Sequence, residues 1–437
     1  MRGADGCGSS RGDEVSVLAV SSERMLAGML DACHGMSMEQ LPAAVRAHAA
    51  QAGLDNVLVY VSDLQEDVLR LLTGQGLDAG QDGGRWPDEL SIADTSAGRC
   101  FETLLPVFDA EAGVSRWWVP LLDGAERVGA LRVDTDLYEG SARRAMRRLA
   151  TLVTMLIMTK RSHSDSYARR VRTQRMNVAA EMQWNLMPPR AFANDQVTIS
   201  AALEPAYEIG GDAFDYALAD DTVHLGIFDA MGHDVAAGLA ANLAVAACRN
   251  NRRQGADLVE TGRAIEKVLV DQLLQTRYVT AVLADLDIRT GELSWISHGH
   301  HAPVLVREDH WTGPLRCPPG APLGTGLGLT ATLCREQLKP GDRLVLYTDG
   351  ITETRDPGGE EFGLERFLNF VIHHNADGMP VPETLRRLVH SILDYHQGRL
   401  QDDATVLLLE WRGPEAGVTG TDVSTALRTH SAQVSQT

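Results

Sequence analysis

The chain of 437 residues is 44% hydrophobic and 23% charged, a composition typical of globular proteins with two or three domains. Its 59 acidic and 40 basic residues give a net charge of −19. Such a field repels nucleic acid and anionic membrane surfaces, which excludes a duplex-binding protein. The longest apolar stretch, residues 149–158, has about half the length that a bilayer requires, and the first residues lack the apolar core of a secretion signal. We therefore expect a cytoplasmic protein with no nucleic-acid and no membrane partner.

The six cysteines are scattered, without a Cys-x-x-Cys spacing. They are Cys7, Cys33, Cys100, Cys248, Cys317 and Cys334. This distribution predicts neither a disulfide framework nor a structural zinc site, and it is typical of a reducing compartment.

The N-terminal part of the chain mixes helical and strand patterns. Residues 1–14 consist of Gly, Ser and charged residues and are predicted to be disordered. Within residues 15–158, the apolar spacing predicts helices at 22–30 and 39–53 and a strand at 56–63.

Residues 116–134 predict two strands joined by a tight Asp-Gly connection, followed by an apolar helix that closes the domain. Residues 15–158 resemble a GAF domain, a small sensory α/β module. The likeness rests on "LVYVSD", "GRCFET" and "WVPLLDGAERVGALRV". It implies a small-molecule ligand in a pocket above the sheet, which Cys100 or Trp118 would line, although core packing is the simpler explanation of both side chains.

Residues 159–190 are rich in Arg and end at a Pro-Pro pair, which stops a helix. Apolar side chains and one Gln repeat here at heptad spacing, which is typical of a helical signalling linker that pairs across a homodimer. The heptad positions hold Tyr167, Val171, Gln174, Val178 and Met182. A helix packed on one domain explains the same pattern equally well.

Residues 191–412 alternate apolar runs with acidic turns and form one predicted domain. Strands are expected at 222–230, in a hairpin at 278–299, and at 342–350 and 402–410, with helices at 235–253, 256–275, 363–375 and 382–396. Residues 413–437 have no periodic core signal and are predicted to be a flexible tail.

Acidic side chains recur at the predicted strand ends of this domain: Asp212, Asp229, Asp349, Asp402 and Asp403. Strand ends are rigid, so these carboxylates can be held to the tolerance that a metal cluster requires. Oxygen ligands without His or Cys favour Mg²⁺ or Mn²⁺. Two such ions lower the pKa of a bound water, orient a phosphate and offset its developing charge. One such Asp alone is most simply a turn residue, but four sites in one domain favour the metal cluster.

The stretch "EIGGDAFDY" also resembles the Gly-Gly-Asp-Glu-Phe segment of diguanylate cyclases. That assignment explains neither "TDG" nor "DDAT" further along the chain. The chain has no Gly-Lys pair and therefore no P-loop, and no cysteine has an Arg six positions later, which excludes a cysteine-phosphatase loop.

Seven motifs in order resemble the PPM-type serine/threonine phosphatases, and more narrowly their bacterial branch typified by the sporulation stage II E phosphatase. They are "EMQWNLMPP", "EIGGDAFDY", "FDAMGHDVAAGLA", "YVTAVLADLDIRTGELSWISHGHHAPVL", "GAPLG", "GDRLVLYTDGITETRDPGGEEFG" and "DDATVLLL". The resemblance implies a central β-sandwich flanked by helices with two metal ions at one edge. The predicted fold class is thus α+β and multidomain, with a GAF-like sensor, a helical linker and a PPM-type sandwich.

The resemblance also implies a role for each motif residue. Asp229 bridges the two metals, and the carbonyl of Ala230 faces one of them. Asp349 and Asp402 hold the other metal, and Asp212 binds directly or through metal-bound water. Asp229 and Asp212 are thereby the residues expected to be essential for catalysis.

Four further residues are expected around these ligands. Gly211 has no side chain and so leaves room for close approach at the site. Asp403 either replaces Asp402 as a metal ligand or supports it. The chain departs from the family's usual Gly-x-Gly after the bridging Asp, which places Asp234 near the site and puts metal affinity in question. His233 is a candidate proton donor to the leaving group.

Four other polar residues of the domain receive no metal role. His298, His300 and His301 match the family's Ala-Gly-His-x-Pro-type turn, and Asp215 is expected to be structural or a partner of the ligands. Zinc is therefore not expected.

The sequence therefore predicts a cytoplasmic Mn²⁺- or Mg²⁺-dependent phosphatase for phosphoserine or phosphothreonine in proteins, regulated by the sensor domain. The resemblance implies a phosphorylated anti-sigma-factor antagonist as its substrate. Two alternatives remain. The domain is a phosphoprotein-binding regulator of the same fold with weak catalysis, or the chain is a scaffold whose sensor part matters most.

Overall fold

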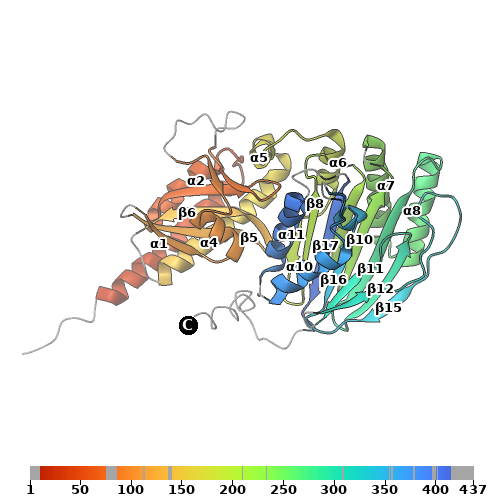
Figure 1. Cartoon of the computed structure of the whole chain (residues 1–437). Helices are drawn as coiled ribbons and strands as arrows, with labels where there is room; N and C mark the ends of the chain where they lie inside the picture. Colours follow the sequence, from red (N-terminus) through yellow and green to blue (C-terminus); the bar gives the residue numbers. More distant parts are fainter. Residues whose placement is uncertain are drawn as a thin grey trace, which may run out of the picture. The chain divides into compact units, whose positions relative to one another are not determined.

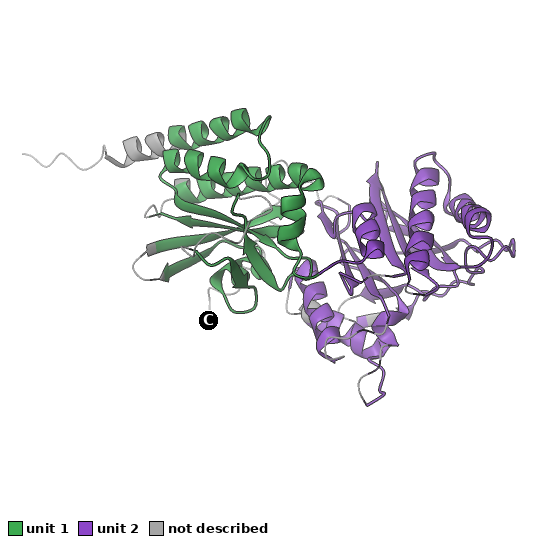
Figure 2. Cartoon of the chain, turned by 90° about the horizontal axis from the view of Figure 1, so that it is seen from above, with its two compact units in different colours: residues 1–174 green, residues 175–437 purple. Residues whose placement is uncertain are grey.

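The structure is a computed structural model in which two compact units, residues 1–174 and 175–437, are distinguished (Figures 1 and 2). It describes residues 10–414 except 75–85, 112–113, 136–139, 209, 233, 308–309, 354, 356–357, 377–378, 396–399 and 401. Among the described helices, none has both the length and the apolar character needed to cross a membrane.

The first unit is an antiparallel sheet with helices on both faces (Figure 1). Its helices are α1 (Ser10–Cys33), α2 (Leu41–Ala49), α3 (Ser96–Thr103), α4 (Gly140–Lys160) and α5 (Asp165–Val171), with 3-10 turns at Ala50–Ala52 and Arg161–His163. Its strands are β1 (Asp55–Ser62), β2 (Val68–Leu71), β3 (Glu89–Ser91), β4 (Val107–Glu111), β5 (Val114–Asp123) and β6 (Glu126–Asp134), in the order β3-β2-β1-β6-β5-β4.

Alternating side chains of this sheet serve two separate cores. Trp117 and Val119 of β5 pack with α1, α2 and α4 on one face, and Trp118 packs with α3 on the other. The Asp-Gly connection predicted between two strands is confirmed: Asp123 ends β5 and Gly124 turns the chain with a φ of 59°. The GAF-like assignment of this unit stays a prediction.

The described helices differ from two expectations for the N-terminal part and the linker. Residues 10–14 begin helix α1, so the expected disorder fails there, while residues 1–9 lie outside the described range. The expected linker helix is broken: α5 ends at Val171, which is buried in the first unit, and α6 (Val178–Leu186) begins the second unit. The heptad positions before and after the break therefore belong to different units, and Asn177 caps the new helix by accepting from Ala180 N–H at 2.7 Å.

The second unit is a sandwich of two sheets. The first sheet has the order β15-β12-β11-β10-β9, and the second β14-β13-β16-β17-β8-β7. The strands are β7 (Ala191–Ala193), β8 (Val197–Glu204), β9 (Asp212–Ala219), β10 (Thr222–Ala230), β11 (Val279–Asp287), β12 (Glu292–His298), β13 (Val304–Arg307), β14 (His310–Pro314), β15 (Cys334–Gln337), β16 (Arg343–Tyr347) and β17 (Ala404–Trp411). The remaining helices are α7 (Val235–Arg252), α8 (Leu258–Leu273), α9 (Asp349–Thr352), α10 (Leu364–Ala376) and α11 (Val381–Tyr395).

Helices cover both outer faces of the sandwich (Figure 1). In β10, Ile227 points into the core between the sheets, whereas Phe228 points outward and packs under α7 and α8. On the other sheet, Leu407 points inward and Val406 outward, where α10 and α11 cover it. This alternation explains why the strand residues are apolar on both faces, and it confirms the predicted β-sandwich flanked by helices.

The cysteine prediction is wrong in one place. Cys334, at the start of β15, forms a disulfide with Cys317. The described cysteines Cys33, Cys100 and Cys248 are free thiols, as expected. The tail from residue 415 onward lies outside the described residues.

Candidate metal centre

The candidate centre begins where β9 and β10 run side by side. Asp212, the first residue of β9, lies opposite Asp229 near the end of β10 in the antiparallel register. The N–H of Ala230 donates to the carbonyl of Gly211 at 3.0 Å. Two of the predicted ligands are thus neighbours because two strands pair at their ends.

Gly211 sits where no side chain fits. A Cβ at this position would lie 2.3 Å from the carbonyl oxygen of Ala230 and 2.6 Å from that of Gly232. Both contacts are to backbone, which cannot move aside without shifting the strand end that carries Asp229. The glycine is therefore required by the close approach of two backbone segments.

Asp212 is held from inside the sandwich. Its Oδ2 accepts hydrogen bonds from the hydroxyls of Thr348 and Thr405, each at 2.7 Å, and the residue is 2% exposed. Burial first, and then the charges of Asp229 and Asp403, raise the pKa of Asp212 well above its usual value. Its backbone carbonyl accepts from the side-chain amide of Gln183 in α6 at 2.7 Å.

Asp403 is bound to the backbone that leads into β9. Its Oδ2 accepts from the N–H groups of Gly210, Gly211 and Asp212 at 2.8, 2.6 and 3.2 Å. Burial raises the pKa of this carboxyl even though the three N–H groups favour its charged form. Asp403 therefore anchors the turn, and its Oδ2 is already engaged.

Asp229 faces other carboxylates. Burial first, and then the charges of Asp349 and Asp402, raise the pKa of Asp229 to about 7. Asp349 is half-buried at the first position of α9, and Asp402 is exposed, with its Oδ1 accepting from the N–H of Asp403 at 2.9 Å. Carboxylates that raise each other's pKa are stabilised by divalent cations, and an all-oxygen set suits Mg²⁺ or Mn²⁺. The donors present therefore fit the expected metal ions.

Thr280, which the sequence reasoning did not single out, contacts both Asp229 and a buried histidine. Its hydroxyl oxygen lies 3.4 Å from Asp229 Oδ2 and 2.7 Å from Nδ1 of His300, whose Nε2 lies 3.1 Å from the carbonyl of Tyr347. Burial and the neighbouring His301 lower the pKa of His300 to about 3, so the ring is neutral. Since a carbonyl only accepts, the proton is on Nε2, and Nδ1 accepts from Thr280.

His301, the residue after His300, belongs to a close group of side chains that could bind a metal ion. Among the described residues, His301, Asp349 and Glu353 place their ligand atoms within 4.8 Å of one another. The His301 ring stacks on Tyr347 with a centroid distance of 5.6 Å. The motifs gave His301 no metal role and did not point to Glu353, which is four positions after Asp349. The four predicted Asp ligands do not form such a tight group in the described chain.

The remaining candidates have other partners. Asp234 caps α7 by accepting from Ala237 N–H at 2.9 Å and pairs with Arg277 at 2.6 Å, and this hydrogen bond and ion pair lower its pKa. His233 lies outside the described residues. Asp215 is buried and accepts from Arg249 at 2.7 Å as a structural ion pair.

The other histidine of the turn is also bound to the backbone. His298 Nδ1 lies 3.1 Å from the carbonyl of Ala321, and burial lowers the pKa of the ring. Together with His300, it helps to hold the turn after β12 and lies apart from the tight group of His301.

Comparison with known proteins agrees with the motifs of this domain. Residues 219–412 match the family model of the stage II sporulation protein E (SpoIIE), the family that the motifs resemble. The chain is 21% identical to the phosphoserine phosphatase RsbU of Bacillus subtilis over 236 residues, which cover 54% of this chain and 69% of RsbU.

Other relatives are matched over less of their length. Protein IcfG of Synechocystis is 24% identical over 260 residues, which cover 53% of this chain and 40% of IcfG. The phosphoserine phosphatase RsbP of Bacillus subtilis is 26% identical over 184 residues, which cover 41% of this chain and 45% of RsbP. The chain thus spans less than half the length of these two relatives.

Two solved structures are similar to about half of this chain. The RsbU and RsbW domains of Rv1364c from Mycobacterium tuberculosis are 25% identical with a TM-score of 0.45, covering 55% of this chain and 69% of that one. The SiaA-PP2C domain of Pseudomonas aeruginosa is 22% identical with a TM-score of 0.43, covering 49% of this chain and 85% of that one.

Proposed function

We propose that the second unit is a metal-dependent protein phosphatase that hydrolyses phosphoserine or phosphothreonine. The single observation that carries the proposal is the set of carboxylates around Asp229, whose pKa is raised to about 7 by burial and by Asp349 and Asp402. Such an arrangement is costly without cations and suited to holding them. The match to the SpoIIE family model and two relatives called phosphoserine phosphatases support the same activity.

The acidic residues of the centre would have two roles, binding the metal ions or holding the ligands in position. Asp229, Asp349, Asp402 and the carbonyl of Ala230 would hold two Mn²⁺ or Mg²⁺ ions, which when bound lower the pKa of water and offset charge on the phosphate. Asp212 would act through the position of its strand, since its Oδ2 already accepts from two threonines.

Asp402 is the better ligand of its pair. Its carboxylate is exposed, and one of its oxygens accepts a hydrogen bond from the N–H of Asp403. In Asp403, by contrast, Oδ2 already accepts hydrogen bonds from three backbone N–H groups. Replacing Asp402 should therefore weaken metal binding, and replacing Asp403 should weaken the fold.

The substrate would be a phosphorylated protein in a partner-switching pathway, and we propose an anti-sigma-factor antagonist. The names of RsbU and RsbP specify phosphoserine as the group that those proteins act on. The first unit would be the sensor that regulates the phosphatase. A cytoplasmic location and a dimer are further parts of this proposal.

The test compares Asp229→Asn with Asp221→Asn, a matched change in the exposed turn between β9 and β10, where Asp221 pairs only loosely with Arg289 at 3.4 Å. Hydrolysis of p-nitrophenyl phosphate and of a phosphoserine protein is measured with Mn²⁺, with and without chelator. We expect Asp229→Asn to lose at least about 100-fold in rate and Asp221→Asn to retain it. Turnover in chelator, or full activity of Asp229→Asn, would refute the proposal.

A weakly catalytic phosphoprotein-binding domain is the alternative, and it was suggested by Asp234. That carboxylate is engaged by the α7 N-terminus and by Arg277, so it does not compete for the cations, which favours the enzyme. Calorimetric titration with Mn²⁺ separates the two, because the enzyme should bind two ions and a degenerate site fewer.

A further inference from the structure

The first unit contains a cavity that the proposed phosphatase does not use. It has a volume of about 510 Å³ and lies between β5 and the first turns of α4. Its floor is apolar, formed by the buried side chains of Trp117, Val119 and Met146. This volume is typical of sites for small molecules.

The rim of the cavity is positively charged. Arg143, Arg144 and Arg147 line it from α4. In the part of the chain that the structure describes, none of their guanidinium groups forms a hydrogen bond or an ion pair, and that of Arg143 only stacks over the Trp117 ring at 4.9 Å. The first turn of α4 contains no acidic residue. Cations at this end of a helix are unfavourable because they face the positive end of the helix dipole, and an anion would offset both charges.

A second observation concerns Trp117 itself. The residue is 5% exposed, and its indole Nε1–H has no hydrogen-bond partner among the described residues. A buried donor without an acceptor costs about 1–3 kcal/mol, and natural structures contain few of them. A polar acceptor on a molecule in the cavity would remove that cost.

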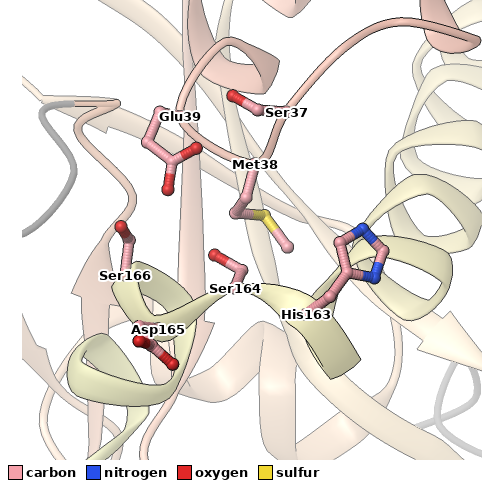
Figure 3. Close-up of a pocket in the computed structure, with 7 residues that line it drawn as sticks. All are labelled: Ser37, Met38, Glu39, His163, Ser164, Asp165 and Ser166. Atoms are coloured by element: carbon pink, nitrogen blue, oxygen red, sulfur yellow. The ribbon is translucent and has the colours of Figure 1, made fainter.

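A second hollow in this unit provides a contrast (Figure 3). It has a volume of about 360 Å³, and polar side chains from two separate segments, including Glu39 and Ser166, gather around it. These groups satisfy one another, since hydrogen bonds from Ser166 and Ser37 lower the pKa of Glu39. It therefore gives no indication of a ligand.

We propose that the cavity under the α4 arginines binds a small amphiphilic anion, with an acyl or aromatic body and a carboxylate or phosphate head. The apolar body would lie against Val119, Met146 and the face of the Trp117 ring. An oxygen of the head would accept from the Trp117 Nε1–H, and Arg144 and Arg147 at the rim would supply charge-assisted hydrogen bonds. This ligand would be the signal of the proposed sensor, but its binding does not depend on the phosphatase activity.

The first experiment titrates the full chain by calorimetry with decanoate below its micelle concentration. Decyl phosphate distinguishes a phosphate from a carboxylate head, and decanol and inorganic phosphate supply the body and the charge alone. We expect one saturable site for decanoate or decyl phosphate, weakened by salt. Decanol and phosphate should bind at least about tenfold more weakly. Equal binding of decanol, or no binding of either decyl anion, would overturn the proposal.

The second experiment locates the site with the double variant Arg144→Gln/Arg147→Gln. The control is Arg148→Gln, because Arg148 is exposed on the same helix and does not line the cavity. The double variant should bind the anion at least about tenfold more weakly and lose most of the salt dependence, whereas the control should bind as the wild type does. Equal effects of the two changes would overturn the proposal. The decanol and salt comparisons use the unaltered chain and decide the matter if the double variant does not fold.

Discussion

Asp403 and Gly211, which are 192 residues apart in the chain, are joined by a hydrogen bond of 2.6 Å from the backbone N–H of Gly211 to Oδ2 of Asp403. The same oxygen accepts from Gly210 and Asp212. The residue before the last strand thus fixes the turn that leads into β9. Asp229 lies opposite the start of that strand, so the geometry of the candidate centre depends on this connection.

Asp403→Ala should destabilise the second unit, because it removes the acceptor of three buried N–H groups. We expect the free energy of unfolding to fall by about 2–5 kcal/mol. Asp403→Asn keeps an oxygen acceptor and should cost about half as much or less. Urea denaturation of the two variants measures both values, and an Ala variant as stable as the Asn variant would contradict the anchoring role.

Asp229 should make the chelated protein less stable as the pH rises from about 4 to about 7. Its folded-state pKa of about 7 lies above the ordinary value of 3.8 for an aspartate, so in that window the folded state binds more protons than the unfolded chain. Stability then falls with rising pH, by up to about 1.4 kcal/mol per pH unit. Thermal denaturation in chelator at several pH values tests this. Asp229→Asn should flatten the slope, and Mn²⁺ at pH 8 should restore stability to the wild type only.

The Cys317–Cys334 disulfide should stabilise the second unit, because it closes a loop of 17 residues in the unfolded chain. Reduction, or Cys334→Ser, should lower the free energy of unfolding by about 2–4 kcal/mol. Cys33→Ser, at a free thiol of the first unit, is the control. Urea denaturation with and without reductant makes the measurement, and thiol titration that finds all cysteines reduced would contradict the bond.

A fragment that begins at residue 175 should keep metal-dependent turnover, whereas one that begins at 191 should be much slower. The shorter fragment lacks α6, whose Gln183 donates to the backbone of Asp212 at 2.7 Å and whose Trp184 donates to the carbonyl of Ala206 at 2.7 Å. We expect at least a tenfold lower rate from the loss of these buried hydrogen bonds. Equal rates of the two fragments would show that α6 is dispensable, and an inactive longer fragment would favour the scaffold alternative.

Local elements of the second unit could be predicted because each depends on a nearby pattern. The alternation in β10 predicts a strand, and the apolar spacing after Asp234 predicts α7, which begins where that side chain caps it. The family motifs likewise predict Asp229 and Asp349 as ligands without any knowledge of distance. These features are encoded within a few residues, so the sequence is sufficient to find them.

Other features depend on contacts between distant segments, which no local pattern contains. The hydroxyls that hold Asp212 come from Thr348 and Thr405, 136 and 193 residues away. The partner of Cys317 could not be chosen from spacing alone. His301 lies near Glu353, which follows α9, and its ring stacks on Tyr347 at the end of β16; His301 alone gave no metal-ligand signal.

The hydroxyl of Thr280 has only one hydrogen, and two acceptors lie within its reach: Nδ1 of the neutral His300 ring at 2.7 Å and Oδ2 of Asp229 at 3.4 Å. The shorter contact to His300 leaves the carboxylate of Asp229 with a weak hydrogen bond from this threonine. A cation beside Asp229 would therefore stabilise a charge that β11 alone satisfies only weakly.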